Sequence, residues 1–249
     1  MEPHATPKKT KSKGIYDAFL CFFLYLIAVS MPSFGYVEQA SFTAFLRFVA
    51  LVAIALLLSR SGFSLPKPSW KGLLLCLPLI VFCYGNMASL LFTDPSAKLE
   101  GDLLRSGVYT LVTAVTEEVV FRFGFMEVLK ETKFKRYRIL VSSLIFGLSH
   151  AAALLAGSAP LSVLAQVGYT FLLGLFLGVA YELGGLLPAI LIHFFFNFLQ
   201  TDLFLAFGGG SWGIVFFACN GVCFLLSGAY GCLLYFRYIW PNRKILIPK

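Results

Sequence analysis

Six strongly polar side chains interrupt long apolar stretches of this 249-residue chain, and their types suit acid–base chemistry. One stretch carries two glutamates and an arginine, the next a histidine, and a later one a histidine and an asparagine: Glu117, Glu118, Arg122, His150, His193 and Asn197. A charged side chain at the centre of a bilayer costs about 2.5–3.5 kcal/mol on insertion scales, and such groups usually face the interior of a helix bundle. Side chains held at that cost are candidates for a functional site.

Spacing along the helices divides these side chains by role. Glu118 and Arg122 are four residues apart and can pair on one helix face, whereas Glu117 is turned about 100° away and is left free. His193 and Asn197 are also four residues apart and project from one face, where their donors could hold a developing oxyanion. A free glutamate beside a histidine can deprotonate a water molecule and pass the proton to a leaving amine. The set therefore contains the parts of a hydrolase.

Helix rise places the key side chains at comparable depth in the membrane. At about 1.5 Å per residue, Glu117 lies about 18 Å and His150 about 20 Å from the inner ends of their spans. On the same basis His193 lies about 10–14 Å into its own span. All three side chains can therefore reach one cavity.

Each group also has an ordinary structural explanation, and a second functional class uses the same residues. A membrane histidine is most often an interhelical hydrogen-bond partner, a Glu–Arg pair can be a packing device, and an asparagine commonly joins helices. Proton-coupled transporters carry intramembrane carboxylates and histidines too. Such transporters favour internal repeats, which are not evident in this sequence.

The composition indicates helices in a membrane. The chain is 59% hydrophobic and 13% charged, against about 25% charged residues in an average soluble domain. The apolar runs are continuous and do not alternate with polar residues, so they indicate helices rather than strands of a barrel. Hydropathy predicts an all-α, polytopic bundle of about eight transmembrane helices, at roughly residues 15–34, 42–59, 72–93, 105–129, 137–156, 161–180, 186–205 and 212–236.

One membrane domain accounts for the chain. It spans residues 15–239 with its motif-bearing core at about 105–205, between a basic tail at 1–14 and a C-terminal tail at 240–249. The first apolar run is longer than the about 7–15 residues of a signal-peptide core and lacks a small-residue cleavage site, so we expect it to be retained. Two glycines at 174 and 178 are spaced for close helix packing, although ordinary tolerance of glycine explains them equally well.

The basic residues predict the orientation. Most of the 20 Lys and Arg fall in segments that would share one side of the membrane: 1–14, 60–71, 130–138 and 237–249. By the positive-inside rule, this distribution predicts an integral, multi-pass protein with both termini cytoplasmic. The net charge of +8 then reflects orientation in the lipid bilayer and not the binding of nucleic acid. The six cysteines all lie within predicted spans, where they act as small apolar residues.

At the polar residues the chain resembles a known family. The motif EExxxR occupies residues 117–122, FxxxH occupies 146–150 and HxxxN occupies 193–197. In this order on separate apolar helices, they are similar to the motifs of the CPBP family, also called Abi. This family comprises CAAX proteases and bacteriocin-processing enzymes, among them the Ras-converting type of CAAX prenyl endopeptidase. The resemblance covers about residues 105–205.

The resemblance implies an intramembrane endopeptidase. Its substrate would be a membrane-associated or lipidated, CAAX-like peptide or protein. Carried over by motif, Glu117 would be the general base and His150 its partner in activating water. His193 and Asn197 would stabilise the oxyanion.

The same resemblance gives Glu118 and Arg122 a supporting role in the architecture. One departure from the family pattern follows directly after the arginine. Members often carry glycine there, whereas this chain has Phe123 and then Gly124. The change affects helix packing behind the site and leaves the proposed catalytic side chains in place.

Two mechanisms fit the resemblance, and we favour the glutamate-dependent, metal-free one, which requires no cofactor. The alternative is a metalloprotease with zinc held by Glu117, His150 and His193, although the usual HExxH pattern is absent. The rival functions are a non-proteolytic membrane protein of bacteriocin self-immunity or partner binding on the same scaffold, and a proton-coupled transporter. The sequence leaves the substrate, the recognition of a prenyl group and the oligomeric state open.

Overall fold

The computed structural model describes most of the predicted membrane domain. It covers residues 11–30, 40–61, 66–81, 103–155, 157–199 and 214–241. Within these segments the regular structure is entirely helical and contains no strand, which confirms the all-α prediction for this part of the chain. Several predicted regions lie outside the described residues, namely the span ends at 31–34, 82–93, 200–205 and 212–213 and the tails at 1–10 and 242–249.

The described helices follow the predicted spans closely. They are α1 (Lys11–Ser30), α2 (Ala40–Ser61), α3 (Trp70–Val81), α5 (Leu103–Glu118), η3 (Val119–Met126), α6 (Glu127–Lys130), η4 (Lys135–Tyr137), α7 (Arg138–Ser149), η5 (His150–Leu154), α8 (Pro160–Gly184), α9 (Leu186–Asn197), α11 (Ile214–Leu234) and η7 (Tyr235–Ile239). The segments η3 and η7 are π-helical, and η4 and η5 are 3₁₀-helical.

Three described helical stretches are long and apolar enough to cross a membrane, namely Lys135–Leu154, Pro160–Gly184 and Ala218–Ile239. Shorter apolar helices cover Gly14–Ala28, Trp70–Ile80 and Leu186–Asn197. These stretches indicate an integral membrane protein, and the count of about eight transmembrane helices stays a prediction.

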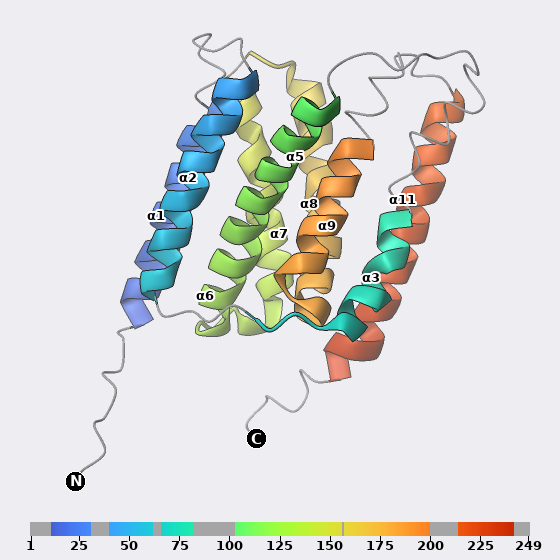
Figure 1. The fold of residues 1–249 in the computed structure, drawn as a ribbon. Coiled ribbons are helices and arrows are strands. Elements are labelled where there is room, and N and C mark those ends of the chain that lie inside the picture. Colours follow the sequence, from blue (N-terminus) through green and yellow to red (C-terminus); the bar gives the residue numbers. More distant parts are fainter. Residues whose placement is uncertain are drawn as a thin grey trace.

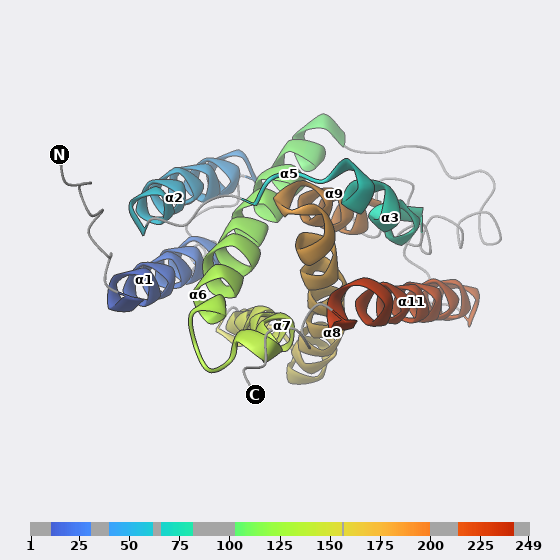
Figure 2. The same cartoon turned by 90° about the horizontal axis from the view of Figure 1, so that it is seen from below.

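The helices form a bundle of roughly aligned rods (Figure 1). α1 and α2 pack together on one flank, and α3 and α11 lie on the opposite flank. α5, α7, α8 and α9 occupy the space between them (Figure 2). The beginning of α1 and the end of η7 lie at the same end of the bundle, together with the connection from α6 to α7.

The span predicted at 105–129 is helical but is not one regular α-helix. α5 ends at Glu118, and the next eight residues form the π-helix η3, whose side chains are all buried. π-helical turns are rare and occur frequently at functional sites. The Ser142 hydroxyl of α7 donates a hydrogen bond of 2.6 Å to the Phe121 carbonyl within η3. This contact ties the irregular segment to the neighbouring helix.

Close packing of α7 against α8 depends on glycines. A Cβ atom at Gly174 would lie 3.0 Å from the Cβ of Ser143, and one at Gly178 would lie 2.7 Å from the Cγ2 of Ile139. Such distances leave no room for a larger side chain unless the helices separate. Of the two explanations that the sequence left open, the structure therefore supports close helix packing.

A tight turn joins α8 to α9 and sets the direction in which α9 leaves. Gly185 has φ of 84° and ψ of −161°, a backbone conformation that favours glycine. Its amide donates to the Tyr181 carbonyl at 2.9 Å, which closes the end of α8. α9 then runs back antiparallel to α8 (Figure 1), and its His193 side chain is buried.

Candidate active site

The centre of the site is a buried ion pair within one stretch of helix. The Nε of Arg122 lies 3.1 Å from Oε2 of Glu118, and both side chains are 0% exposed. The guanidinium also lies 4.8 Å from the ring centroid of Phe146 on α7. Removing one partner of a buried pair strands the other charge and costs about 3–5 kcal/mol. The i, i+4 spacing predicts this pair, and the structure contains it.

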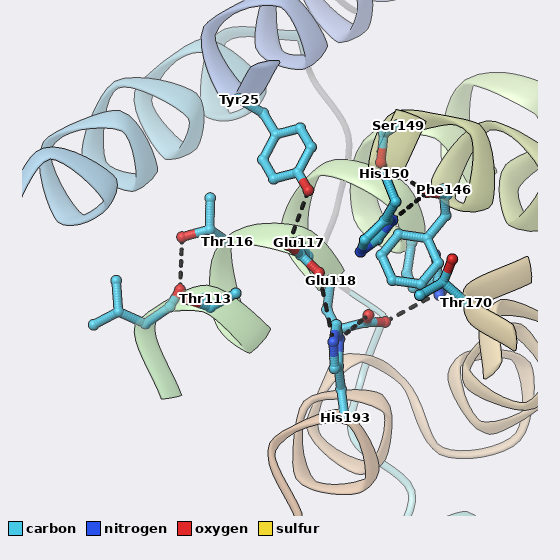
Figure 3. Close-up of polar contacts among 12 residues, drawn as sticks. Tyr25, Thr113, Thr116, Glu117, Glu118, Phe146, Ser149, His150, Thr170 and His193 are labelled. Atoms are coloured by element: carbon cyan, nitrogen blue, oxygen red, sulfur yellow. Dashed lines mark hydrogen bonds and ion pairs between the residues drawn. The ribbon is translucent and has the colours of Figure 1, made fainter. Parts of the chain in front are cut away.

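His193 lies between the two adjacent glutamates (Figure 3). Its Nδ1 is 2.8 Å from Oε1 of Glu118, and its Nε2 is 3.5 Å from Oε2 of Glu117. A carboxylate paired with arginine can only accept hydrogen bonds, so the Nδ1 of His193 carries a proton and donates it to Glu118. The imidazole is thereby oriented by one carboxylate and presents Nε2 to the other.

Glu117 is not the free carboxylate that the spacing argument expects. The Tyr25 hydroxyl donates a hydrogen bond of 2.8 Å to Oε1 of Glu117, and His193 approaches the other oxygen. Tyr25 comes from α1 and its ring packs edge-on against Phe121, with the centroids 5.3 Å apart. The expectation fails because it considered only the helix of Glu117, whereas the contact depends on the packing of α1 against that helix.

Sequence reasoning missed Tyr25, although α1 carries a signal for it. Besides Asp17, the buried side chains of this helix are Ala18, Cys21, Tyr25 and Ala28, which recur at helical spacing on one face. Three of the four are small, and the fourth is the one whose hydroxyl needs a partner when buried. A tyrosine on the small-residue face of an apolar helix therefore indicates a polar contact inside the bundle.

His150 opens the 3₁₀ segment η5 directly after α7 ends. Its Nδ1 lies 3.0 Å from the Phe146 carbonyl one turn earlier. Because a carbonyl oxygen only accepts, Nδ1 carries the proton and Nε2 is left as the nitrogen that can act on a substrate or water. The span predicted at 137–156 thus changes from α to 3₁₀ geometry at the histidine itself.

A cavity of about 280 Å³ brings three of the predicted catalytic side chains together. Its walls come from α5, α7, η5, α8 and α9, and they comprise Tyr109, Thr110, Thr113, Phe146, His150, Gln166, Tyr169, Thr170, Leu173, His193 and Asn197. Hydroxyl, amide and imidazole groups thus share one pocket with apolar side chains. Glu117 is not among the lining residues and stands next to the cavity through its contact with His193.

Arg47, on α2, contacts two of the residues that line this cavity. The guanidinium of Arg47 donates to the Thr113 hydroxyl and lies 4.7 Å from the ring centroid of Tyr109. Both contacted residues line the cavity. Together with Tyr25, Arg47 shows that the first two helices contribute polar groups around the site.

The zinc alternative requires Glu117, His150 and His193 to converge on one point. Among the described residues, no group of three or more His, Cys, Asp or Glu side chains is arranged to hold a metal ion. In the present geometry His193 directs Nδ1 to Glu118 and Nε2 toward Glu117. The three proposed ligands therefore do not form a metal site in this arrangement.

Comparison with known proteins identifies the part of the chain that holds the site. Residues 100–199 match the family model described as type II CAAX prenyl endopeptidase Rce1-like. The match contains all six polar residues of the motifs and overlaps the core predicted at 105–205. No curated protein and no solved structure matches the chain.

Proposed function

Because residues 100–199 match the model of the Rce1-like type II CAAX prenyl endopeptidase family, we propose that this integral membrane protein is an intramembrane endopeptidase. It would hydrolyse a peptide bond in a membrane-associated or lipidated, CAAX-like peptide or protein. One observation carries the proposal. His193 lies between Glu117 and Glu118 at the wall of a cavity that His150 and Asn197 also line.

The charges around His193 suggest how the resting site is stabilised. With His193 protonated on both nitrogens, the cluster of Glu117, Glu118, Arg122 and His193 carries two negative and two positive charges. Its Nδ1–H donates to Glu118, and its Nε2–H points to Glu117 across 3.5 Å. A neutral set of this kind can be buried at far lower cost than an isolated charge.

Substrate binding would redirect the Nε2 hydrogen of His193. The substrate carbonyl enters the cavity, and its oxygen accepts from Nε2–H of His193 and from the side-chain amide of Asn197. Oε2 of Glu117 is then released from His193 and can take a proton from water. Oriented donors aimed at a developing oxyanion are worth about 3–4 kcal/mol each.

Hydrolysis then follows general acid–base chemistry. The water oxygen attacks the carbonyl carbon while Glu117 takes its proton, and Nε2 of His150 holds the water in line. The carbon–nitrogen bond breaks as Glu117 returns the proton to the leaving nitrogen. The immediate products are a carboxylic acid and an amine, and the acid then passes its proton to the amine to give a carboxylate and an ammonium group. The protein ends in its starting protonation state. No cofactor takes part in these steps.

Tyr25 would position the general base. Its hydroxyl holds Oε1 of Glu117, so Oε2 is the oxygen that faces His193 and the cavity side. A hydrogen bond to a charged group contributes about 1.5–3 kcal/mol. This assigns a role to α1, which lies outside the residues that match the family.

We propose a multi-pass topology of about eight spans with both termini cytoplasmic. The basic segments and the shared position of the described chain ends in Figure 1 support it. Reporter fusions at Lys13 and Lys249 should both report the cytoplasm. Opposite locations for the two ends would require an odd number of spans and overturn the topology.

The activity is tested with purified protein in proteoliposomes and a farnesylated reporter peptide that ends in a CAAX sequence. Wild type should release the C-terminal fragment, and Glu117→Gln should reduce the rate by about 10²–10⁴-fold. Glu131→Gln, which removes an exposed carboxylate in the turn after α6, is the matched control and should cleave at the wild-type rate. Equal rates for wild type and Glu117→Gln would refute the role of Glu117. Failure of wild type to cleave either this or an unprenylated reporter would favour the non-proteolytic function.

A further inference from the structure

A second, larger cavity lies between α7, α8 and α11, on the opposite side of the bundle from α1 and α2 (Figure 2). Its volume is about 740 Å³, within the range of about 300–1,000 Å³ that is typical of small-molecule sites. It shares no lining residue with the polar cavity that holds His150 and His193. This larger cavity, called the groove below, is therefore a separate feature of the fold, and nothing in the proposed hydrolysis uses it.

The lining of this groove is almost entirely hydrocarbon. α8 contributes Leu172, Phe176 and Val179, and α11 contributes Phe224 and Leu225 across from them. A peptide segment in such a groove would leave its backbone amides and carbonyls without partners, at several kcal/mol per group in an apolar medium. The lining therefore fits an alkyl chain and not a polypeptide.

Polar and amphipathic groups gather at one end of the groove. Arg136 and Tyr137 precede α7, and Tyr235 begins η7, so the polar members of the lining lie at the end where α7 starts and α11 finishes. The guanidinium of Arg136 lies 5.4 Å from the ring centroid of Trp240. Tyrosine and tryptophan mark the level of lipid headgroups, where one side of the ring is apolar and the other is wet.

The charge at this end is positive overall. Arg138 is paired with Glu182 and Lys130 with Glu127, and the connection between them carries three more basic residues, Lys133, Lys135 and Arg136, against one carboxylate, Glu131. Basic pockets between transmembrane helices commonly hold anionic lipid headgroups. Positive charge above a hydrocarbon groove complements a molecule with an anionic head and an apolar tail.

We propose that the groove binds a phospholipid with an anionic headgroup. Its phosphate contacts Arg136 at the aromatic end, and one acyl chain lies along the groove between α8 and α11. Gly228 lines the groove, and a Cβ atom there would come only to ordinary contact, 3.9 Å from Cζ of Phe176. A leucine at this position fits the backbone and fills the space that the chain occupies.

Gly221 provides the matched control on the same helix. A Cβ atom there meets nothing within 4 Å, and the residue does not line the groove. Gly221→Leu therefore adds the same side chain to α11 as Gly228→Leu without entering the groove. Arg136→Gln removes the charge and keeps a side chain of similar reach.

The test is native mass spectrometry of the full chain released from nanodiscs that contain equal amounts of phosphatidylglycerol and phosphatidylcholine. Wild type and Gly221→Leu should each retain one phosphatidylglycerol, and Gly228→Leu should lose it. Arg136→Gln should lower the preference for phosphatidylglycerol over phosphatidylcholine about fivefold, the effect of one basic residue near a membrane surface.

Three outcomes would overturn the proposal. Gly228→Leu could retain phosphatidylglycerol as wild type does, or Arg136→Gln could keep the full preference for the anionic lipid. The third is displacement of the lipid by a farnesylated peptide that Gly228→Leu cannot hold, which would make the groove a site for the substrate chain. If Gly228→Leu does not fold, judged by its elution profile, the Arg136→Gln preference decides alone.

Discussion

The motif-bearing core, from α5 to α9, and the helix α1 both place side chains around the carboxylate of Glu117, and these side chains have different roles. α5, η5 and α9 supply the motif residues with the chemical groups of the proposed reaction. α1 supplies only Tyr25, which belongs to no motif and holds the Glu117 oxygen that faces away from His193. The difference suggests that the reacting groups are recognisable by pattern, whereas the groups that position them are recognisable only by packing.

The largest effect is expected from breaking the buried pair inside the motif-bearing core. Glu118→Gln leaves Arg122 buried without its charge partner and replaces the charged acceptor of Nδ1 of His193 with a neutral amide. We expect the free energy of unfolding to fall by about 3–5 kcal/mol. Thermal unfolding in detergent measures it, with Glu131→Gln as the exposed control. Unchanged stability would mean that the pair does not hold the core together.

The second-largest effect is expected on kcat, when His193 is removed from the cavity wall. His193→Ala removes the Nε2 donor from the cavity wall, and we expect kcat to fall by about 10²–10³-fold through loss of oxyanion stabilisation. The reporter assay in proteoliposomes measures it, with protein quantity corrected by elution profile. A change confined to KM would show that His193 binds substrate and does not stabilise the transition state.

A smaller effect is expected at α1. Tyr25→Phe removes one hydrogen bond to Glu117 and keeps the ring against Phe121, so turnover should fall by about 10–100-fold. Tyr16→Phe on the exposed face of the same helix should change nothing, since its side chain is 71% exposed.

A double-mutant cycle separates positioning from a general effect of Tyr25 on packing. If Tyr25 acts through Glu117, Tyr25→Phe should have little further effect in the Glu117→Gln background. Equal losses in both backgrounds would show that α1 influences the site only through structure. The distinction between reacting groups in the core and a positioning group on α1 would then not hold.

The smallest effect is expected from chelation. In the proposed reaction Glu117, His150 and His193 act directly on water and substrate and do not bind a metal. Activity should therefore survive prolonged chelation, and purified protein should contain no stoichiometric metal. Elemental analysis beside the activity assay measures both. One zinc per chain, lost and restored together with activity, would assign the same residues to a metalloprotease.

The sequence predicts those features that depend on local periodicity. The all-α class follows from continuous apolar runs, and the Glu118–Arg122 contact follows from i, i+4 spacing. The spacing of Gly174 and Gly178 places both on one helix face, but it left open whether they allow close packing, which the structure decided. Each of these predictions requires only that a helix repeats every 3.6 residues.

Other features depend on long-range packing and could not be read from the pattern. The π-helix η3 and the 3₁₀ turn η5 break the regular period. The first contains Arg122, and the second begins at His150. The link from Tyr25 to Glu117 joins residues 92 positions apart. Spacing within one helix carries no information about such a contact, so Glu117 was expected to be free.

The most direct test of the central claim compares the membrane proteomes of cells that carry wild type or Glu117→Gln at equal protein levels. Peptide termini are mapped by mass spectrometry in both. If Glu117 is the base of an endopeptidase, uncleaved precursors of membrane-associated proteins accumulate in the variant, and their mature termini are lost. Identical sets of termini in the two strains would contradict the account, because the glutamate at the centre of the site would then have no proteolytic role.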